Sequence, residues 1–462
     1  MQERVLIAGA GPVGLVAAAH LARNGVPVIV FEGGPTLSEE SRASTFHPPT
    51  LDMLHALGAA ELLIAQGLKA PTFQYRSKKH GLLAQFDFGG IADVTEHPYR
   101  VQCEQSKLTR ILYDQMRGHP NFEVHFDSPV VGVTQDASGV EITIDRDGRT
   151  ERRSGRYLVG ADGASSKVRR GLGIEFEGFT WPDRLLVVTT PFDFHSVIPD
   201  LSPVSYVADP ERWYFLLQIP PGVWRVMFLV NEDASDERVQ TREFAQSLMA
   251  GVVPGISNYP IEHITLYKVH QRVAKTFRQD RVFLIGDAAH INNPLGGMGM
   301  NGGIHDAVNL ARRLASVWRG EVPDAELDRF DKQRRLVTLE YIQNYTIQNK
   351  KNLESSGDEF RQSLQAIKAD TVRTREYLLR VINDRKPASS RGVRLGRRSA
   401  ITLTSALGQK RTCAVQKYMS ALPPKATSNA TYGTPAKGQS ERNSVQPGKP
   451  IFGMGSGKKA PA

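Results

Sequence analysis

The chain is poor in cysteine and has no long apolar run. Only two of its 462 residues are cysteines, Cys103 and Cys413. Two cysteines cannot build a disulfide framework or a structural zinc centre, so we expect neither, and we expect no metal site. No apolar stretch reaches the roughly 18–20 residues that a membrane-spanning helix needs, and no leader precedes the first predicted strand. These absences predict a cytoplasmic protein without stable membrane insertion.

Acidic residues are nearly missing from residues 386–462, which contain fourteen lysines and arginines and the single acid Glu441. The whole chain has a net charge of +10, so the excess of positive charge belongs to this tail and residues 1–385 are slightly acidic. The tail is rich in Ser, Thr, Pro, Gly and Lys, a composition typical of disorder. Residues 408–426 resemble a translated repeat, which favours a frameshift or read-through product. The alternative is a basic arm for nucleic acid or membrane. We expect no nucleic-acid partner.

A glycine-rich turn joins the first predicted strand, residues 4–8, to a helix over residues 13–23. Its sequence is Gly9-Ala10-Gly11-Pro12-Val13-Gly14. The first glycine permits a tight turn, the second lets the backbone approach a pyrophosphate, and the third lets helix and strand pack closely. A second buried strand, residues 28–31, ends at Glu32, whose carboxylate can accept hydrogen bonds from a ribose. The pattern predicts a dinucleotide site in a doubly wound, Rossmann-type α/β domain, and it leaves FAD and NAD(P) as alternatives.

The rest of the chain alternates between helical and strand-like segments, and its length allows two or three domains. We expect helices over residues 51–57, 106–117, 303–319 and 325–350, and strands over residues 122–126, 130–135, 140–145, 157–159 and 281–285. Residues 185–230 contain several strand-like runs separated by Pro and Gly, which is typical of an antiparallel sheet. The predicted division is a discontinuous FAD-binding domain (1–72, 98–180, 270–350), a substrate domain (73–97, 181–269), a helical region (351–385) and the tail (386–462).

Two further motifs follow buried strands. The first is the stretch from Gly160 to Arg169, which contains Asp162-Gly163, Ser166 and Arg169. It also fits a capped helix, with Ser165 or Asp162 as the cap. The second is Gly286-Asp287, at the carboxyl end of a strand, where ligands bind in such sheets. Five glycines between residues 296 and 303 then let backbone N–H groups approach a ligand at the start of the next helix.

With these motifs the sequence resembles the flavoprotein aromatic hydroxylases of the para-hydroxybenzoate hydroxylase class, whose DGxxSxxR motif matches residues 162–169. The resemblance covers roughly residues 1–350. It implies an FAD cofactor, with NAD(P)H as cosubstrate bound without a second Rossmann domain. It also implies that the flavin C4a-hydroperoxide transfers oxygen from O2 to an electron-rich, usually phenolic, ring. The small-molecule partners are therefore an aromatic substrate and O2, and a homodimer is an open alternative.

The resemblance also assigns cofactor-binding residues. It implies that Asp287 contacts the ribityl chain, that Gln105 of a QxxLxxxL helix reaches FAD, and that Arg42 lies beside the cofactor, although Arg42 also fits a surface arginine. Gly33-Gly34 after Glu32 departs from the family, which commonly has a basic residue there. The expected cofactor-binding residues are Gly9, Gly11, Pro12, Val13, Gly14, Glu32, Arg42, Gln105, Asp162, Asp287, Gly297, Gly299, Met300 and Asn301.

Four residues are candidates for the catalytic site. The carbonyl of Pro294 is expected to face the substrate. Arg225 could pair with a substrate anion or be an exposed sheet residue. His290 could act as a base or be a buried structural residue, and Tyr214, or Tyr206 in its place, could activate a phenol. Alternation places Trp213 with Phe215, and Arg225 with Met227, on one face of the sheet.

Three other functions stay open from the sequence. A related flavoenzyme could act as a quinone-pathway hydroxylase or an epoxidase. An FAD-dependent reductase would not transfer oxygen at all. A nucleic-acid binder is suggested by the basic tail alone.

Overall fold

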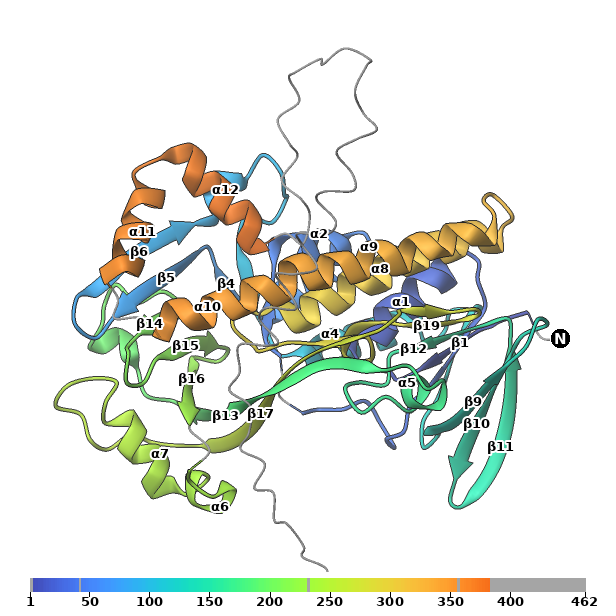
Figure 1. Cartoon of the computed structure of the whole chain (residues 1–462), viewed down its shortest axis with the longest axis horizontal. Helices are drawn as coiled ribbons and strands as arrows, with labels where there is room; N and C mark the ends of the chain where they lie inside the picture. The colour runs from blue at the N-terminus through green and yellow to red at the C-terminus, as the bar shows by residue number, and fades with distance from the viewer. Residues whose placement is uncertain (1–2, 41–42, 231–232, 355–357, 383–462) are drawn as a thin grey trace, which may run out of the picture. The chain divides into compact units, whose positions relative to one another are not determined.

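The computed structural model describes residues 3–40, 43–230, 233–354 and 358–382 (Figure 1). Three predictions fall outside these residues: the cofactor contact of Arg42, the place of Cys413 in the tail, and the disorder of the basic tail itself. No helix among the described residues has the length and apolarity required to span a bilayer.

A six-stranded sheet forms the first layer, in the order β18-β19-β12-β1-β2-β8. Its strands are β18 (Arg278–Gln279), β19 (Val282–Leu284), β12 (Tyr157–Gly160), β1 (Val5–Ala8), β2 (Val28–Phe31) and β8 (Phe122–His125). All neighbours pair in parallel except β18 with β19. Strands β1 and β2 are buried along their whole length, as their apolar runs predict. The doubly wound α/β fold is confirmed.

Two small antiparallel sheets accompany this layer. One contains β9 (Val130–Gln135), β10 (Val140–Arg146) and β11 (Arg149–Gly155), with the predicted turn between the last two. The other contains β3 (Thr45–Phe46), β7 (Arg100–Gln102) and β4 (Leu68–Ala70). The second sheet matters for the site because β3 and β7 supply buried side chains. Along the chain, β3 and β7 stand where the polypeptide passes from one large sheet to the other.

An eight-stranded sheet forms the second layer, in the order β20-β17-β13-β16-β15-β14-β5-β6. Its strands are β20 (His290–Ile291), β17 (His263–Ala274), β13 (Phe176–Thr190), β16 (Val223–Val230), β15 (Tyr214–Ile219), β14 (Val204–Ala208), β5 (Thr72–Ser77) and β6 (Gly81–Asp87). It is antiparallel except where β14 pairs with β5. The predicted alternation is confirmed for the aromatic residues, since Trp213 and Phe215 share one core with Met227, whereas Tyr214 belongs to the core on the other face.

Helices cover both layers. They are α1 (Pro12–Arg23), α2 (Pro48–His55), α3 (Ala60–Gln66), α4 (Gln105–Met116), α5 (Lys167–Gly171), α6 (Asp236–Val239), α7 (Arg242–Met249), α8 (Met298–Trp318), α9 (Asp328–Val337), α10 (Asn344–Glu354), α11 (Asp358–Lys368) and α12 (Thr371–Ile382), with 3₁₀ turns at residues 88–91, 194–196, 286–288 and 324–327. Helices α1 and α8 pack against each other, and α11 lies against β6 (Figure 1).

The predicted helix over residues 325–350 is confirmed as a helical segment that runs without a break from Asp328 to Glu354, but it contains a turn that the sequence does not predict. A π-helical turn, Thr338–Gln343, separates α9 from α10. Such a turn inserts extra backbone per turn and changes the direction of the side chains that follow. Here Gln343 donates to the carbonyl of Ile291, and Thr346 accepts from Gln271. Tertiary hydrogen bonds to Gln271 and Ile291 therefore favour this helix geometry. Sequence periodicity gives no information about such bonds.

A buried ionic network connects α8 and α9 with β19 and β20. Asp306, which is fully buried, lies 2.5 Å from Nε of Arg334 and 2.7 Å from Nε2 of His290, and it accepts from the backbone N–H of Gly286. Burial alone raises the pKa of Asp306, but the charges of Arg334 and His290 outweigh it and hold the pKa below its ordinary value of 3.8. The ionised carboxylate is therefore part of the folded state.

We predict that Asp306→Asn lowers the free energy of unfolding by about 3–5 kcal/mol, because it leaves the Arg334 guanidinium buried without its counter-charge. Because the pKa of Asp306 is depressed on folding, its contribution is present above the ordinary value and is lost as the pH falls below about 4. Urea unfolding at several pH values measures both effects. Asp328→Asn, at an exposed ion pair with Arg278, is the control and should cost about 1 kcal/mol or less. Equal losses in the two variants would contradict the assignment.

Candidate functional site

The turn between β1 and α1 forms an open backbone cradle. Gly9 has φ of +102°, and a side chain on Gly14 would lie 2.1 Å from the carbonyl oxygen of Gly9. Gly11 differs from both, because a Cβ there would meet no protein atom within 4 Å. No side chain caps the N-terminus of α1, so its free N–H groups point into this space. Pro12 and Val13 begin the helix beside it.

Glu32 lies at the end of β2, directly beside the cradle. Its carboxylate accepts hydrogen bonds from the backbone N–H groups of Ala10 at 2.7 Å and Gly34 at 3.0 Å. A carboxylate has about four acceptor positions, so these two bonds leave capacity for a ribose diol. The backbone of Gly34 thus helps to hold the Glu32 carboxylate, although a backbone N–H does not require glycine at this position.

The motif after β12 is built around a short capped helix. Asp162 accepts from the N–H groups of Lys167 and Val168, and Ser166 caps α5 by accepting from Arg169. The cap is therefore Ser166 together with Asp162, and the expectation of Ser165 is wrong, because Ser165 is exposed. Oδ1 of Asp162 is buried and has no hydrogen-bond partner. One carboxylate oxygen is thus available at the edge of the cradle.

Arg169 connects this motif to the next one. Its guanidinium donates to the carbonyls of Ala288 and Ala164, both at 2.8 Å, and lies 3.8 Å from the ring centre of Phe176. The spacing of the motif thus has a structural consequence: an arginine at this position holds the turn that contains Asp287. Asp287 itself is exposed although its neighbours on both sides are buried.

The glycine-rich loop ends at Gly297, whose backbone is left-handed (φ +68°) and which begins α8 without a side-chain cap. A Cβ on Gly299 would meet no protein atom within 4 Å. Asn301 holds the loop in place, since its amide donates to the carbonyls of Gly297 and Thr45 and accepts from the N–H of His47. Asn301 is thus a positioning residue in the folded chain, in addition to its expected place at the cofactor. Met300 beside it is buried.

These elements fit an FAD molecule. Two helices with uncapped N-termini supply N–H groups for a pyrophosphate and a flavin. Gly11 and Gly299 leave open approaches to the backbone, and the carboxylates of Glu32, Asp162 and Asp287 lie on the turns that follow three strands of one sheet, β2, β12 and β19. Gln105 begins α4 and is partly exposed. The cofactor-binding residues stay a prediction, and their arrangement is the one that a dinucleotide requires.

The predicted catalytic residues are not brought together. Pro294 is exposed and borders a pocket whose other walls come from the eight-stranded sheet and α10: Trp181, Asp183, Leu185, Trp213, Leu229, Val269, Asn293, Leu295 and Lys350. Tyr214 lies on the opposite face of that sheet, where its hydroxyl is 3.4 Å from the carbonyl of Val252. Tyr206, the alternative, belongs to the same core as Trp213 and Leu295.

Two other predicted residues have protein partners. Arg225 is buried and donates to Glu104 at 3.1 Å. The alternative that Arg225 is an exposed sheet residue is therefore wrong. His290 is fully buried, lies against the ring of Phe277, and is bound by Asp306. Its position agrees with the structural alternative.

Sequence reasoning missed three residues behind the glycine-rich loop: His47, Arg100 and Tyr345. A Cβ on Gly297 would lie 3.3 Å from Nε2 of His47, and a Cβ on Gly296 would lie 2.7 Å from the ring of Tyr345. Burial and the charge of Arg100 lower the pKa of His47 well below its ordinary value, and burial raises the pKa of Tyr345 to about 12. No motif marks these residues, because the pairing of β3 with β7 brings His47 and Arg100 together and Tyr345 comes from α10, far away in sequence.

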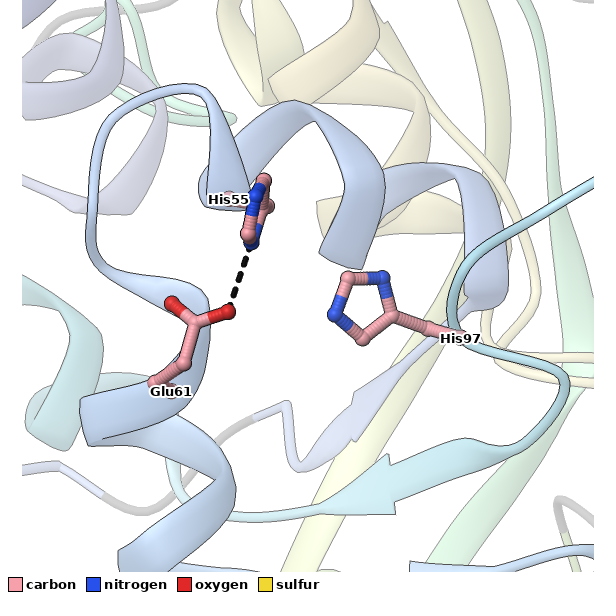
Figure 2. Close-up of side chains that lie close together, drawn as sticks. All are labelled: His55, Glu61 and His97. Carbon is pink, nitrogen blue, oxygen red and sulfur yellow. Dashed lines mark hydrogen bonds and ion pairs between the residues drawn. The ribbon is translucent and has the colours of Figure 1, made fainter.

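A separate cluster contains His55, Glu61 and His97 (Figure 2), whose ligating atoms lie within 4.8 Å of one another. Nδ1 of His55 lies 2.6 Å from Glu61, and Nδ1 of His97 lies 2.7 Å from Asp52. The bond to Glu61 raises the pKa of His55. Each histidine thus has a carboxylate partner without an ion, and the expectation that the chain has no metal site stays untested.

The comparisons with known proteins agree with this geometry. The model of the FAD binding domain family matches residues 2–345. Para-nitrophenol 4-monooxygenase of Pseudomonas sp. (strain WBC-3) is 35% identical over 342 residues, which cover 73% of this chain and 84% of the relative. The 6-hydroxy-3-succinoylpyridine 3-monooxygenase of Pseudomonas putida is 33% identical over 355 residues, 76% of this chain and 89% of the relative. The crystal structure of a p-nitrophenol 4-monooxygenase from Pseudomonas putida superposes with a TM-score of 0.78 at 30% identity and covers 83% of this chain and 99% of that one.

We predict that Gly11→Ala and Gly14→Ala separate cofactor binding from folding. Gly11 has extended backbone that any residue adopts, so its alanine variant should unfold at the wild-type temperature when stripped of flavin and yet bind little FAD. In Gly14→Ala the new methyl group meets the Gly9 carbonyl, which should destabilise the protein by roughly 1–3 kcal/mol. Thermal unfolding and the flavin-to-protein ratio measure the two effects. Full flavin content in Gly11→Ala would place the pyrophosphate elsewhere.

Proposed function

The chain belongs to the FAD binding domain family and is an FAD-dependent aromatic monooxygenase with NAD(P)H as cosubstrate, and we propose that its substrate is a small phenol. The observation that carries the proposal is the place of Pro294. This residue joins the flavin cradle to a pocket bordered by two tryptophans, Trp181 and Trp213, and by the ion pair of Asp183 with Lys350. The two indole rings are surfaces against which a flat ring can pack, and the pocket, about 10 Å³ in volume, has to widen to admit one.

The relatives support a hydroxylated ring as the substrate class. Their names state para-nitrophenol, 6-hydroxy-3-succinoylpyridine, 3-(3-hydroxy-phenyl)propionate and pentachlorophenol as substrates. All four are single rings that carry an oxygen. These substrates differ in their other substituents. They therefore support a phenol as the substrate class, and the other substituents of the substrate depend on the residues of this chain.

When bound, FAD supplies the redox chemistry that takes electrons from NAD(P)H and activates O2. The chain's own residues orient the ring and exclude water. Leu185, Leu229 and Val269 give the pocket apolar walls beside the Asp183–Lys350 ion pair, and Leu295 is buried beneath the loop. A dry pocket protects the activated oxygen from unproductive loss as hydrogen peroxide.

The polar residues near the pocket have different proposed roles. The carbonyl of Pro294 faces the ring. Arg225, already paired with Glu104, shapes the sheet and is a weaker candidate for the substrate than the sequence suggests. Tyr206 replaces Tyr214 as the candidate hydroxyl, because it lies in the core that contains Leu295. We also propose that the protein works in the cytoplasm, where reduced nicotinamide nucleotides are available, and has no nucleic-acid partner.

We predict that the purified protein is yellow and that a phenol increases its NAD(P)H oxidation several-fold, with formation of a hydroxylated product. Oxygen uptake, NAD(P)H absorbance and product analysis on a panel of phenols measure this. Gly11→Ala is the matched control, since it should fold and show no stimulated oxidation. NAD(P)H oxidation that consumes no O2 would indicate the reductase, and an epoxide product the alkene epoxidase. Either result would refute the proposed hydroxylation.

A further inference from the structure

Arg100 is a buried cation without a counter-charge among the described residues. It lies on β7 and is 1% exposed. Its Nε and Nη1 atoms have no hydrogen-bond partner, and no ion pair with a carboxylate is formed by it in the described part of the chain. Its guanidinium lies 4.9 Å from the ring centre of Phe73 and 5.3 Å from that of Phe88. These rings hold the group in place and do not satisfy its N–H donors.

The other buried arginines show what a structural role looks like. Arg334 binds Asp306, Arg169 binds two backbone carbonyls, and Arg184 and Arg225 bind acidic side chains: Asp236 and Glu104 respectively. Removing a guanidinium from water without a hydrogen-bonded partner is costly, and buried polar groups that stay unsatisfied call for a specific explanation. Arg100 therefore differs from the arginines that stabilise the fold.

His47 lies beside Arg100 and is also unsatisfied. Both of its ring nitrogens are buried without a hydrogen-bond partner of regular geometry. Burial first, then the charges of Arg100 and His305, lower its pKa, whereas the backbone of Gly296 acts in the opposite direction. The ring is thus neutral, so it offers a hydrogen bond without adding a second positive charge next to Arg100.

The pair lies behind the glycine-rich loop, residues 294–303, on the side of Gly296 and Gly297. His47 lies under Gly297, and the charge of Arg100 reaches the hydroxyls of Tyr345 and Tyr377, whose pKa values it lowers against the effect of burial. Tyr345 touches Gly296, two positions after Pro294. The titratable groups whose pKa the charge of Arg100 shifts are one histidine and two tyrosines, His47, Tyr345 and Tyr377, and these include no carboxylate. An anion is the ligand that this surrounding selects.

We propose that Arg100 and His47 form a subsite that binds the anionic oxygen of the aromatic substrate, and that this oxygen is a phenolate. The inference rests on the proposed function. A phenolate supplies the negative charge that Arg100 lacks and accepts hydrogen bonds from both side chains. It also makes the ring richer in electrons, which favours attack by an electrophilic oxygen. A ring carboxylate would satisfy the same charge and is the competing source of the anion.

The test measures binding to the flavin-loaded protein in the absence of NAD(P)H, so that no turnover is needed. The probe is 4-nitrophenol, whose phenolate is yellow and whose neutral form is nearly colourless. We expect the wild type to bind it as the phenolate at a pH at which the free compound is largely neutral. Arg100→Met should weaken binding by about 10- to 100-fold and abolish this shift in ionisation, because charged hydrogen bonds are lost. Arg100→Lys should restore part of both effects.

Two control ligands separate the sources of the anion. The methyl ether 4-nitroanisole cannot ionise, and its affinity should change by less than about threefold in Arg100→Met, which shows that the pocket is intact. If 4-nitrobenzoate binding depends on Arg100 and 4-nitrophenol binding does not, the phenolate assignment is overturned. If phenolate binding depends on Arg100 but no phenol is hydroxylated, the subsite stands and the proposed function fails.

Thermal unfolding distinguishes a ligand-binding role from a structural one. Without a phenol, Arg100→Met should unfold at or above the wild-type temperature, since it removes an uncompensated buried charge. Arg334→Met is the matched control and should unfold at a clearly lower temperature, because it leaves Asp306 buried and unpaired. A loss of stability in Arg100→Met equal to that in Arg334→Met, with unchanged phenolate affinity, would overturn the proposal.

Discussion

The site depends on the close contact of backbone with backbone at glycine. A side chain on Gly14 would collide with the carbonyl of Gly9, one on Gly9 with the carbonyl of Ala161, and one on Gly303 with the Cα atom of Gly286. These contacts connect helix α1, the turn after β12, the turn after β19 and helix α8. Three motifs that are far apart in sequence therefore meet closely because each has a glycine at the point of contact. The free N–H groups at the two helix starts are the result, and they are what a dinucleotide can bind.

Much of this arrangement could be predicted from the sequence, because it is local. Each glycine motif follows a short buried strand and begins a helix, so its position on the fold follows from its neighbours along the chain. The alternation of Trp213 and Phe215 was equally readable, since strand geometry fixes it. The π-helical turn inside the helix over residues 325–350 was not readable, because hydrogen bonds from Gln271 and to Ile291, which are distant in sequence, favour it. The prediction that Tyr214 activates a phenol is not supported by the structure, for a related reason. Alternation tells which residues share a face of the sheet, but not which face the loop of Pro294 approaches.

His47 and Arg100 could not be found in this way at all. They are brought together by the antiparallel pairing of β3 with β7, in which Phe46 opposes Val101. Their importance appears only when burial and hydrogen bonding are compared across the molecule. Arg334 and Arg100 are about equally hidden from water, yet one is held by Asp306 and the other by aromatic rings. The pairing of Arg334 with Asp306 stabilises the fold. The lack of a carboxylate at Arg100 among the described residues is explained when a ligand supplies the negative charge.

The C-terminal helices α11 and α12 pack into the core behind the proposed substrate pocket. The family model ends at residue 345, but α11 and α12 contribute Phe360, Leu364, Leu378 and Val381 to the core that contains Tyr206 and Leu295. The hydroxyl of Tyr377, on α12, lies 3.0 Å from that of Tyr75, whose ring stacks on Tyr206. The wall beside Arg100 is therefore completed by a segment that the shared domain does not include. Since cofactor chemistry is common to the family, differences between its members in the ring they accept should be sought in this segment and in the strands that it covers.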